Sequence, residues 1–302
     1  MILDGVGYAD TLIQEAIGLE EAGQVHEALV LYERVIDLAE DDEPLADALT
    51  RKAGALGTLG RRAASLAVCD ELIERFAARP WLASYARYYK AAAAREDAKP
   101  HEALALLDEL VEDAHEPLLA EALLLKALTL GDLRRAGEAL ALYDEIAVAD
   151  ERVSVRALAW KIELLNEVAR PREAVALARH AIARFDGASD PDVRRHLASV
   201  HLQLGLGLEA VRDWPGALAA YEGMLAAFPA GETPDTDAQR EWAELRHAAL
   251  RTMRWVDVHR GWLGAGAAAL LIFTVVVGTG RRRDRERRPV AIRLRQGAER
   301  GR

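Results

Sequence analysis

The sequence is poor in cysteine, proline and aromatic residues, and these shortages restrict its fold. Cys69 is the single cysteine among 302 residues, which excludes an internal disulfide and any metal site built from several cysteines. Only 10 prolines are present, and aromatic residues make up 6% of the chain. Alanine and leucine dominate instead, a composition that suits helices far better than sheets. We therefore expect an all-α protein.

Motifs that carry chemistry are also missing. The chain contains no G-x-x-x-x-G-K-[ST] phosphate-binding loop. His26-Glu27 and His101-Glu102 begin like the zinc motif H-E-x-x-H, but neither has the second histidine. Cys69 lies in an apolar helical pattern, which predicts a buried and inert thiol. We expect no enzyme activity, no catalytic residues, no metal and no cofactor.

Basic charge is scarce before residue 281 and concentrated after it. Residues 281–302 hold 10 arginines against Asp284, Glu286 and Glu299, a net charge of +7. Subtracting these from the 39 basic and 49 acidic residues of the chain leaves 29 basic and 46 acidic residues for 1–280, a net charge of −17. Such an acidic region repels nucleic acid, so no nucleic-acid partner is expected.

A repeat becomes visible when six amphipathic segments are aligned. Each has apolar residues at i, i+3, i+4 and i+7, the spacing of a helix with one buried face. Equivalent residues in successive segments are 37, 38, 36, 35 and 43 positions apart. The segments are 27–36, 64–73, 102–111, 138–147, 173–182 and 216–225, and their equivalent residues are Leu29, Leu66, Leu104, Leu140, Val175 and Leu218.

A partner helix is predicted before each segment, so the chain reads as six helical hairpins. Proline is tolerated in the first turn of a helix, and Pro44, Pro80 and Pro191 fit such starts, with Asp190 as an N-cap. Three further prolines are expected in the turns within hairpins: Pro100, Pro171 and Pro215. The predicted first helices lie near 9–22, 45–59, 81–95, 117–131, 152–168 and 192–208.

The hairpins carry a recognisable pattern of small and aromatic residues. Small residues recur in the first helices, as at Ala16, Ala53 and Gly205, and Gly23 and Gly60 match the turn. The second helices carry alanine followed four residues later by an aromatic residue: Ala28/Tyr32, Ala139/Tyr143 and Ala217/Tyr221. Over residues 8–230 the chain resembles the tetratricopeptide repeat (TPR) family. The resemblance implies a right-handed superhelical solenoid of about six hairpins.

The resemblance also implies a concave groove that binds a protein or peptide. Family members line this groove with residues from their first helices. An apolar groove with tyrosine anchors fits helix-in-groove or extended-peptide recognition, while packing between hairpins is the alternative role for the same residues. The implied groove positions are Ile13, Ile17, Thr50, Tyr85, Tyr88, Arg95, Leu124, Leu128, Glu163, Asn166, Leu202 and Leu206.

A different organisation is expected after the repeats. Thr236 and Gln239 have capping-box spacing and predict an amphipathic capping helix over 236–258. Residues 261–280 are 20 residues without a charge, enough for a helix of ~30 Å that crosses one hydrocarbon core. A buried core helix is the alternative. The Arg-rich tail 281–302 is expected to be disordered.

The predicted single-pass anchor makes two contacts with lipid. Trp262 and Arg281, Arg282 and Arg283 stand at its two ends, where tryptophan favours the interface and arginine favours anionic lipid headgroups. Positive-inside preference would keep the tail in the cytoplasm and the repeats outside. The N-terminus, however, lacks the pattern of a secretory signal. We expect a bacterial cytoplasmic membrane with the repeats in the cytoplasm, and keep an envelope assembly factor with external repeats as the alternative.

Overall fold

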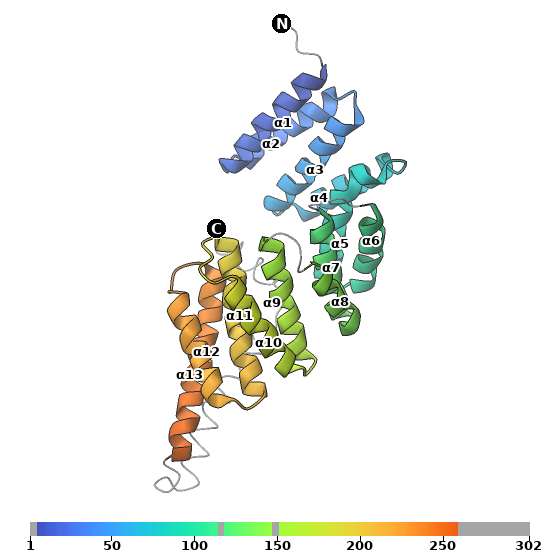
Figure 1. Cartoon of the computed structure of the whole chain (residues 1–302). Helices are drawn as coiled ribbons and strands as arrows, with labels where there is room; N and C mark the ends of the chain where they lie inside the picture. Colours follow the sequence, from blue (N-terminus) through green and yellow to red (C-terminus); the bar gives the residue numbers. More distant parts are fainter. Residues whose placement is uncertain (1–4, 114–117, 147–150, 259–302) are drawn as a thin grey trace. The chain divides into compact units, whose positions relative to one another are not determined.

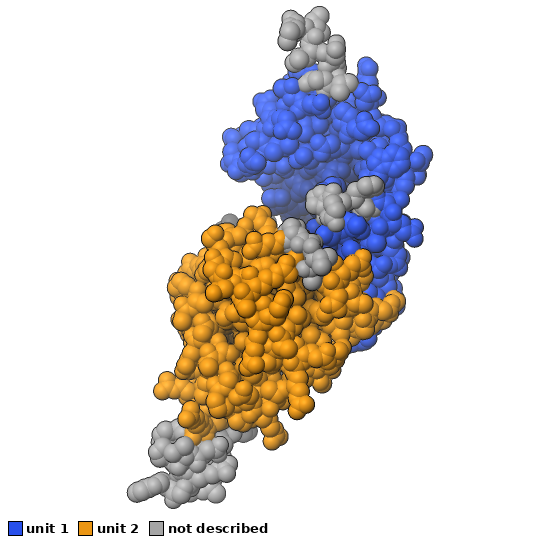
Figure 2. Space-filling view, in the orientation of Figure 1, with its two compact units in different colours: residues 1–134 blue, residues 135–302 orange. Residues whose placement is uncertain are grey.

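The computed structural model describes residues 5–113, 118–146 and 151–258. Within these ranges the chain forms thirteen α-helices and one short 3-10 helix, and no strand. The all-α prediction is therefore confirmed. By its contacts the chain divides into two compact units, residues 1–134 and 135–302, shown in Figure 2.

Unit 1 contains the first seven helices (Figure 1). They are α1 (Gly5–Glu21), α2 (Val25–Leu38), α3 (Asp42–Thr58), α4 (Arg62–Arg75), η1 (Pro80–Ala83) leading into α5 (Ser84–Glu96), α6 (Pro100–Asp113) and α7 (Leu118–Asp132). Unit 2 contains α8 (Ala136–Ile146), α9 (Glu151–Glu167), α10 (Pro171–Arg184), α11 (Pro191–Ala210), α12 (Trp214–Ala227) and α13 (Pro234–Val258).

Neighbours in sequence are neighbours in space within each unit. Each helix packs on the next one along the chain, and first helices also contact the first helix of the following pair, as in α1 with α3 and α9 with α11. A lone hairpin cannot bury both of its faces, so this stacking completes the core. The helices thus pack as sequential antiparallel pairs, consistent with a helical repeat array.

The turns inside the hairpins share one backbone conformation. Gly23 and Gly60 have positive φ angles of 78° and 70°, as expected for the residue that ends a helix. Four later turns place a non-glycine residue in this left-handed region: Ala98, Arg134, Ala169 and Arg212, with φ of 58–63°. Bonds such as Gln24 N to Leu19 O and Asp213 N to Leu208 O, 2.8 and 2.9 Å, close the turns. Closing the tight turn outweighs the steric cost of a side chain there.

Three helix starts differ from the predictions. Pro100 and Pro171 are the first residues of α6 and α10, and Pro215 is the second residue of α12, so none lies in a turn. The first helical turn has unpaired N–H groups in any case, so proline suits it. Asp190 is confirmed as an N-cap, because its carboxylate accepts bonds from Asp192 N and Val193 N at 2.9 and 3.2 Å.

The helix after the repeats begins two residues earlier than predicted and with another cap. Thr233 Oγ1 accepts a hydrogen bond from Thr236 N at 3.1 Å, so Thr233 and not Thr236 holds the helix start. Thr236 is buried instead. Asp237 accepts a bond from Gly231 N at 2.8 Å. Because Pro234 occupies the first helical position well, the cap falls on the residue before it.

The C-terminal predictions lie beyond the described residues. The uncharged segment 261–280, the tail 281–302, Trp262 and the three arginines 281–283 all fall there. Among the helices that the structure does describe, none combines the length and the apolar character needed to cross a bilayer.

Candidate protein-binding surfaces

A tyrosine packed against a small residue positions the two helices of a hairpin. Tyr32, Tyr143 and Tyr221 are all at most 2% exposed. Gly205 faces Tyr221 so closely that a Cβ atom there would lie 2.2 Å from Cε1 of the ring. The Tyr32 and Tyr221 hydroxyls reach the end of the preceding helix, donating to Glu20 and Glu209 at 2.8 and 2.6 Å. The small–aromatic pattern therefore has a direct packing role.

A recurring side-chain pair crosses five of the six junctions between a second helix and the helix that follows it. At these junctions the acidic residue just after the aromatic slot of the second helix binds a lysine or, at the last junction, a histidine on the following helix. At the α10–α11 junction the same position is Arg179. Sequence reasoning missed this feature, although a lysine directly before the small residue of helices α3, α5 and α7 was its signal. The pairs are Glu33–Lys52 (3.1 Å), Asp70–Lys90 (2.5 Å), Asp108–Lys126 (2.8 Å), Asp144–Lys161 and Glu222–His247 (3.0 Å).

Unit 1 exposes an aromatic pair at the start of α5. Tyr85 is 44% exposed, and Trp81, four residues earlier in η1, is 54% exposed. Arg87 is buried and donates to the Pro80 carbonyl at 2.6 Å, which holds η1 against α5. Tyr88 is half-buried and meets Tyr89 edge to face, with ring centroids 6.1 Å apart. Trp81 was not among the predicted positions, although its spacing from Tyr85 was the available signal.

The other groove positions of unit 1 differ in how much surface they offer. Ile13 and Leu124 are buried in the core, so a partner finds little of them to touch. Arg95 binds the Asp132 carboxylate at 2.7 Å. Three more positions are half-buried: Ile17, Thr50 and Leu128.

In unit 2 the predicted positions form a mixed polar surface. Glu163 is exposed, yet surrounding protein atoms desolvate its carboxylate and raise its pKa, with repulsion from Glu167 adding to the effect. Asn166 donates to the carbonyl and side-chain oxygens of Gln203, at 3.1 and 3.0 Å. Leu202 is buried, whereas Leu206 is half-buried. Among the predicted groove positions of unit 2, Glu163 is thus the most accessible to a partner.

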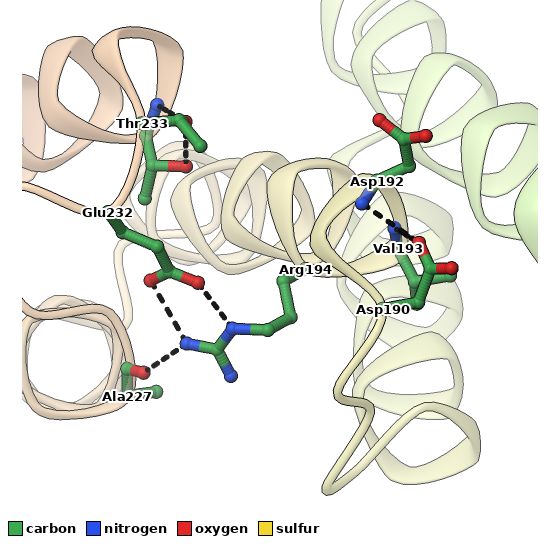
Figure 3. A network of polar contacts seen from close by, with 8 residues as sticks. Asp190, Asp192, Val193, Arg194, Ala227, Glu232 and Thr233 are labelled. Carbon is green, nitrogen blue, oxygen red and sulfur yellow. Dashed lines mark hydrogen bonds and ion pairs between the residues drawn. The ribbon is translucent and has the colours of Figure 1, made fainter. Parts of the chain in front are cut away.

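A polar network at the N-terminal end of α11 fixes the start of α13 (Figure 3). The Arg194 guanidinium forks onto the Glu232 carboxylate, with Nη2 at 3.0 Å, and also donates to the Ala227 carbonyl at 3.1 Å. The same guanidinium lies 5.1 Å from the centroid of the Phe228 ring. These contacts tie the α12–α13 connection to α11, and α13 packs on both α11 and α12.

Cys69, the single cysteine, lies in surroundings that keep its thiol unreactive. Cys69 is fully buried, and burial raises the pKa of its thiol to about 11, which keeps the thiolate unpopulated. Within the described residues, no three side chains of the His, Cys, Asp and Glu types lie where they could hold a metal ion together.

Comparison with protein-family models and with curated proteins found no match to this chain. The structure itself shows that the described residues form a sequential array of antiparallel helix pairs.

Proposed function

We propose that the chain is a membrane-anchored scaffold of the TPR type that binds a protein or peptide and performs no catalysis. The observation that carries the proposal is a junction that recurs after α2, α8 and α12, where a buried tyrosine is followed by an acidic residue paired with the next helix. In the last of these, the tyrosine ring packs directly on Gly205. Such junctions build a stacked array whose first helices remain available for binding. The right-handed superhelix of the family is part of this proposal.

The exposed aromatic pair is the proposed anchor for the partner. Trp81 and Tyr85 are large apolar side chains left in solvent, and aromatic residues of this kind dominate binding energies at interfaces. Tyr88 and Tyr89 extend the aromatic surface toward Gly54, where the Tyr89 hydroxyl lies 3.5 Å from the position of a Cβ atom. A partner with an apolar helix or extended segment fits this surface.

Site-specific photo-cross-linking tests the binding role. A photoreactive amino acid at position 85 should form adducts with one protein partner in cells. The same group at Val30, which is 63% exposed on α2, is the matched control and should form none. Equal adducts at both positions, or none at position 85, would contradict a specific surface on α5.

The orientation of the anchor is the second part of the proposal. We place the repeats in the cytoplasm and residues 261–280 in the membrane. Protease protection of residues 1–258, combined with a reporter fused after Arg302, separates the two orientations. Protected repeats with an external reporter support a cytoplasmic scaffold. Digested repeats with an internal reporter support the alternative, an envelope assembly factor, which the arginine-rich tail favours through the positive-inside preference.

A further inference from the structure

One end of unit 2 gathers exposed arginines, although residues 1–280 together are strongly acidic. The α9–α10 and α11–α12 turns lie side by side there and border an open depression of about 550 Å³. Arg170 in this depression is held by Glu173 through two bonds of 2.6 Å. Arg172 and Arg212 also line it and are exposed, and neither has a carboxylate partner among the described side chains.

Exposed apolar side chains flank the two arginines. Trp214, the first residue of α12, is 46% exposed, and Val168, just after α9, is 37% exposed. The Asp213 carboxylate keeps its negative charge but is turned to the start of α12, where it accepts the capping bond from Gly216 N at 3.0 Å. Tryptophan next to unpaired arginine is the combination that favours the headgroup region of a membrane.

Helix α13 runs past this end of unit 2 and leads toward the proposed membrane span. Arg240 in the first half of α13 donates to the Leu225 and Phe228 carbonyls at 2.8 Å, at the far end of α12. Arg246 binds the Glu209 carboxylate, next to the α11–α12 turn. The helix then continues to Val258 (Figure 1), a further ~18 Å at 1.5 Å per residue.

The last part of α13 adds to the basic charge. Arg251 and Arg254 are exposed and have no carboxylate partner among the described side chains. Arginine side chains and a headgroup layer of ~5–7 Å per leaflet can fill much of the distance over which the helix extends past Arg246. The uncharged segment begins at residue 261, only three residues after α13 ends.

We propose that the turn face, defined as Arg172, Arg212 and Trp214 with Arg251 and Arg254 of α13, binds anionic lipid headgroups. The inference rests on the proposed membrane span. It concerns the leaflet that the chain enters, whereas Arg281–Arg283 would lie in the opposite one. Docking of the turn face fixes how unit 2 stands on the membrane.

Fluorescence quenching by headgroup-labelled lipid tests the turn face on the full chain in vesicles. A dye is attached at Ala210→Cys, an exposed position in the depression, or at Ser189→Cys, an exposed control at the opposite end of unit 2. Cys69 is buried and stays unlabelled. We expect strong quenching at position 210 and none at 189. Quenching at position 210 should weaken in purely zwitterionic vesicles and at high salt.

A charge variant with a matched control decides whether the arginines cause the docking. Arg172→Gln with Arg212→Gln should lower the ratio of docked to undocked chains by roughly 25-fold, about fivefold for each arginine. Arg179→Gln removes another exposed charge, from the middle of α10, and should change nothing.

The outcomes separate the inference from the proposal beneath it. A chain that floats with vesicles but shows equal quenching at 210 and 189 overturns the turn face alone. Quenching that survives Arg172→Gln with Arg212→Gln does the same. A chain that fails to float with vesicles overturns the membrane anchor together with the turn face.

Discussion

The ring of Tyr221 occupies the space that a side chain at Gly205 would need: a Cβ atom there would lie 2.2 Å from Cε1. The contact joins α11 to α12, and Tyr221 is fully buried. An aromatic ring held in a packed core cannot move aside as a flexible chain end can.

Gly205→Ala should therefore destabilise unit 2, although alanine favours helices. Overpacking costs roughly 1–3 kcal/mol, while exchanging glycine for alanine inside a helix gains about 1 kcal/mol. We expect a net loss of about 1 kcal/mol, seen as a lower melting temperature of the full chain in detergent. Gly223→Ala is the control, because nothing lies within 4 Å of its missing Cβ. That variant should melt higher; a higher melting temperature for Gly205→Ala as well would refute the close packing.

We expect the ion pairs of the array to contribute differently to the free energy of unfolding, according to how deeply they are buried. Glu209 is 10% exposed and is bound by both Arg246 and Tyr221. Arg246→Met leaves this carboxylate without its cation, so we expect a loss of about 2 kcal/mol. Lys126→Met frees Asp108, which is 56% exposed, and should cost at most about 1 kcal/mol. Denaturant midpoints give both values, and equal losses would be inconsistent with this ranking.

The helix positions were predictable because periodic apolar residues and the tyrosine slots report local packing. The turn conformations were harder to predict. Ala98, Ala169 and Arg212 adopt a left-handed backbone conformation, which alanine and arginine do not favour. The tight closure of each hairpin imposes this conformation, and only the spacing between the helices indicated it in the sequence.

The binding surface was less predictable, since exposure depends on which neighbour covers a side chain. Tyr85 and Leu124 occupy comparable predicted positions, but the first is 44% exposed and the second 1% exposed. The turn face was unpredictable for the same reason: Arg172 and Arg212 are 40 positions apart in the sequence and come together only in the folded unit.

Acid should weaken the packing of α11 through His196. Burial is the main cause that lowers the His196 pKa to about 4, and Arg195 and Arg156 add repulsion. The ring also meets Trp160 edge to face, with centroids 6.0 Å apart. Because this pKa lies below the unfolded value of about 6.5, the unfolded chain binds more protons between these two values. Stability therefore falls as pH drops from about 6.5 to 4.

Replacement of His196 should flatten this pH dependence. His196→Phe removes the titrating group, so the unfolding free energy should lose up to roughly 2 kcal/mol of its change over this pH range. Substitution of the exposed His26 by Gln serves as the control and should leave the slope unchanged. An unchanged slope in His196→Phe would show that other groups cause the acid sensitivity.

Vesicle flotation with alkaline extraction is the most direct test of the central claim, that residues 261–280 anchor a helical repeat array in a membrane. The full chain should float with vesicles and resist extraction at alkaline pH. A chain ending at residue 260 should stay in solution with the same helical content per residue in the repeats. If the full chain is released by alkali, or if the shortened chain loses its helices and precipitates, segment 261–280 is part of the protein core and the anchored scaffold is wrong.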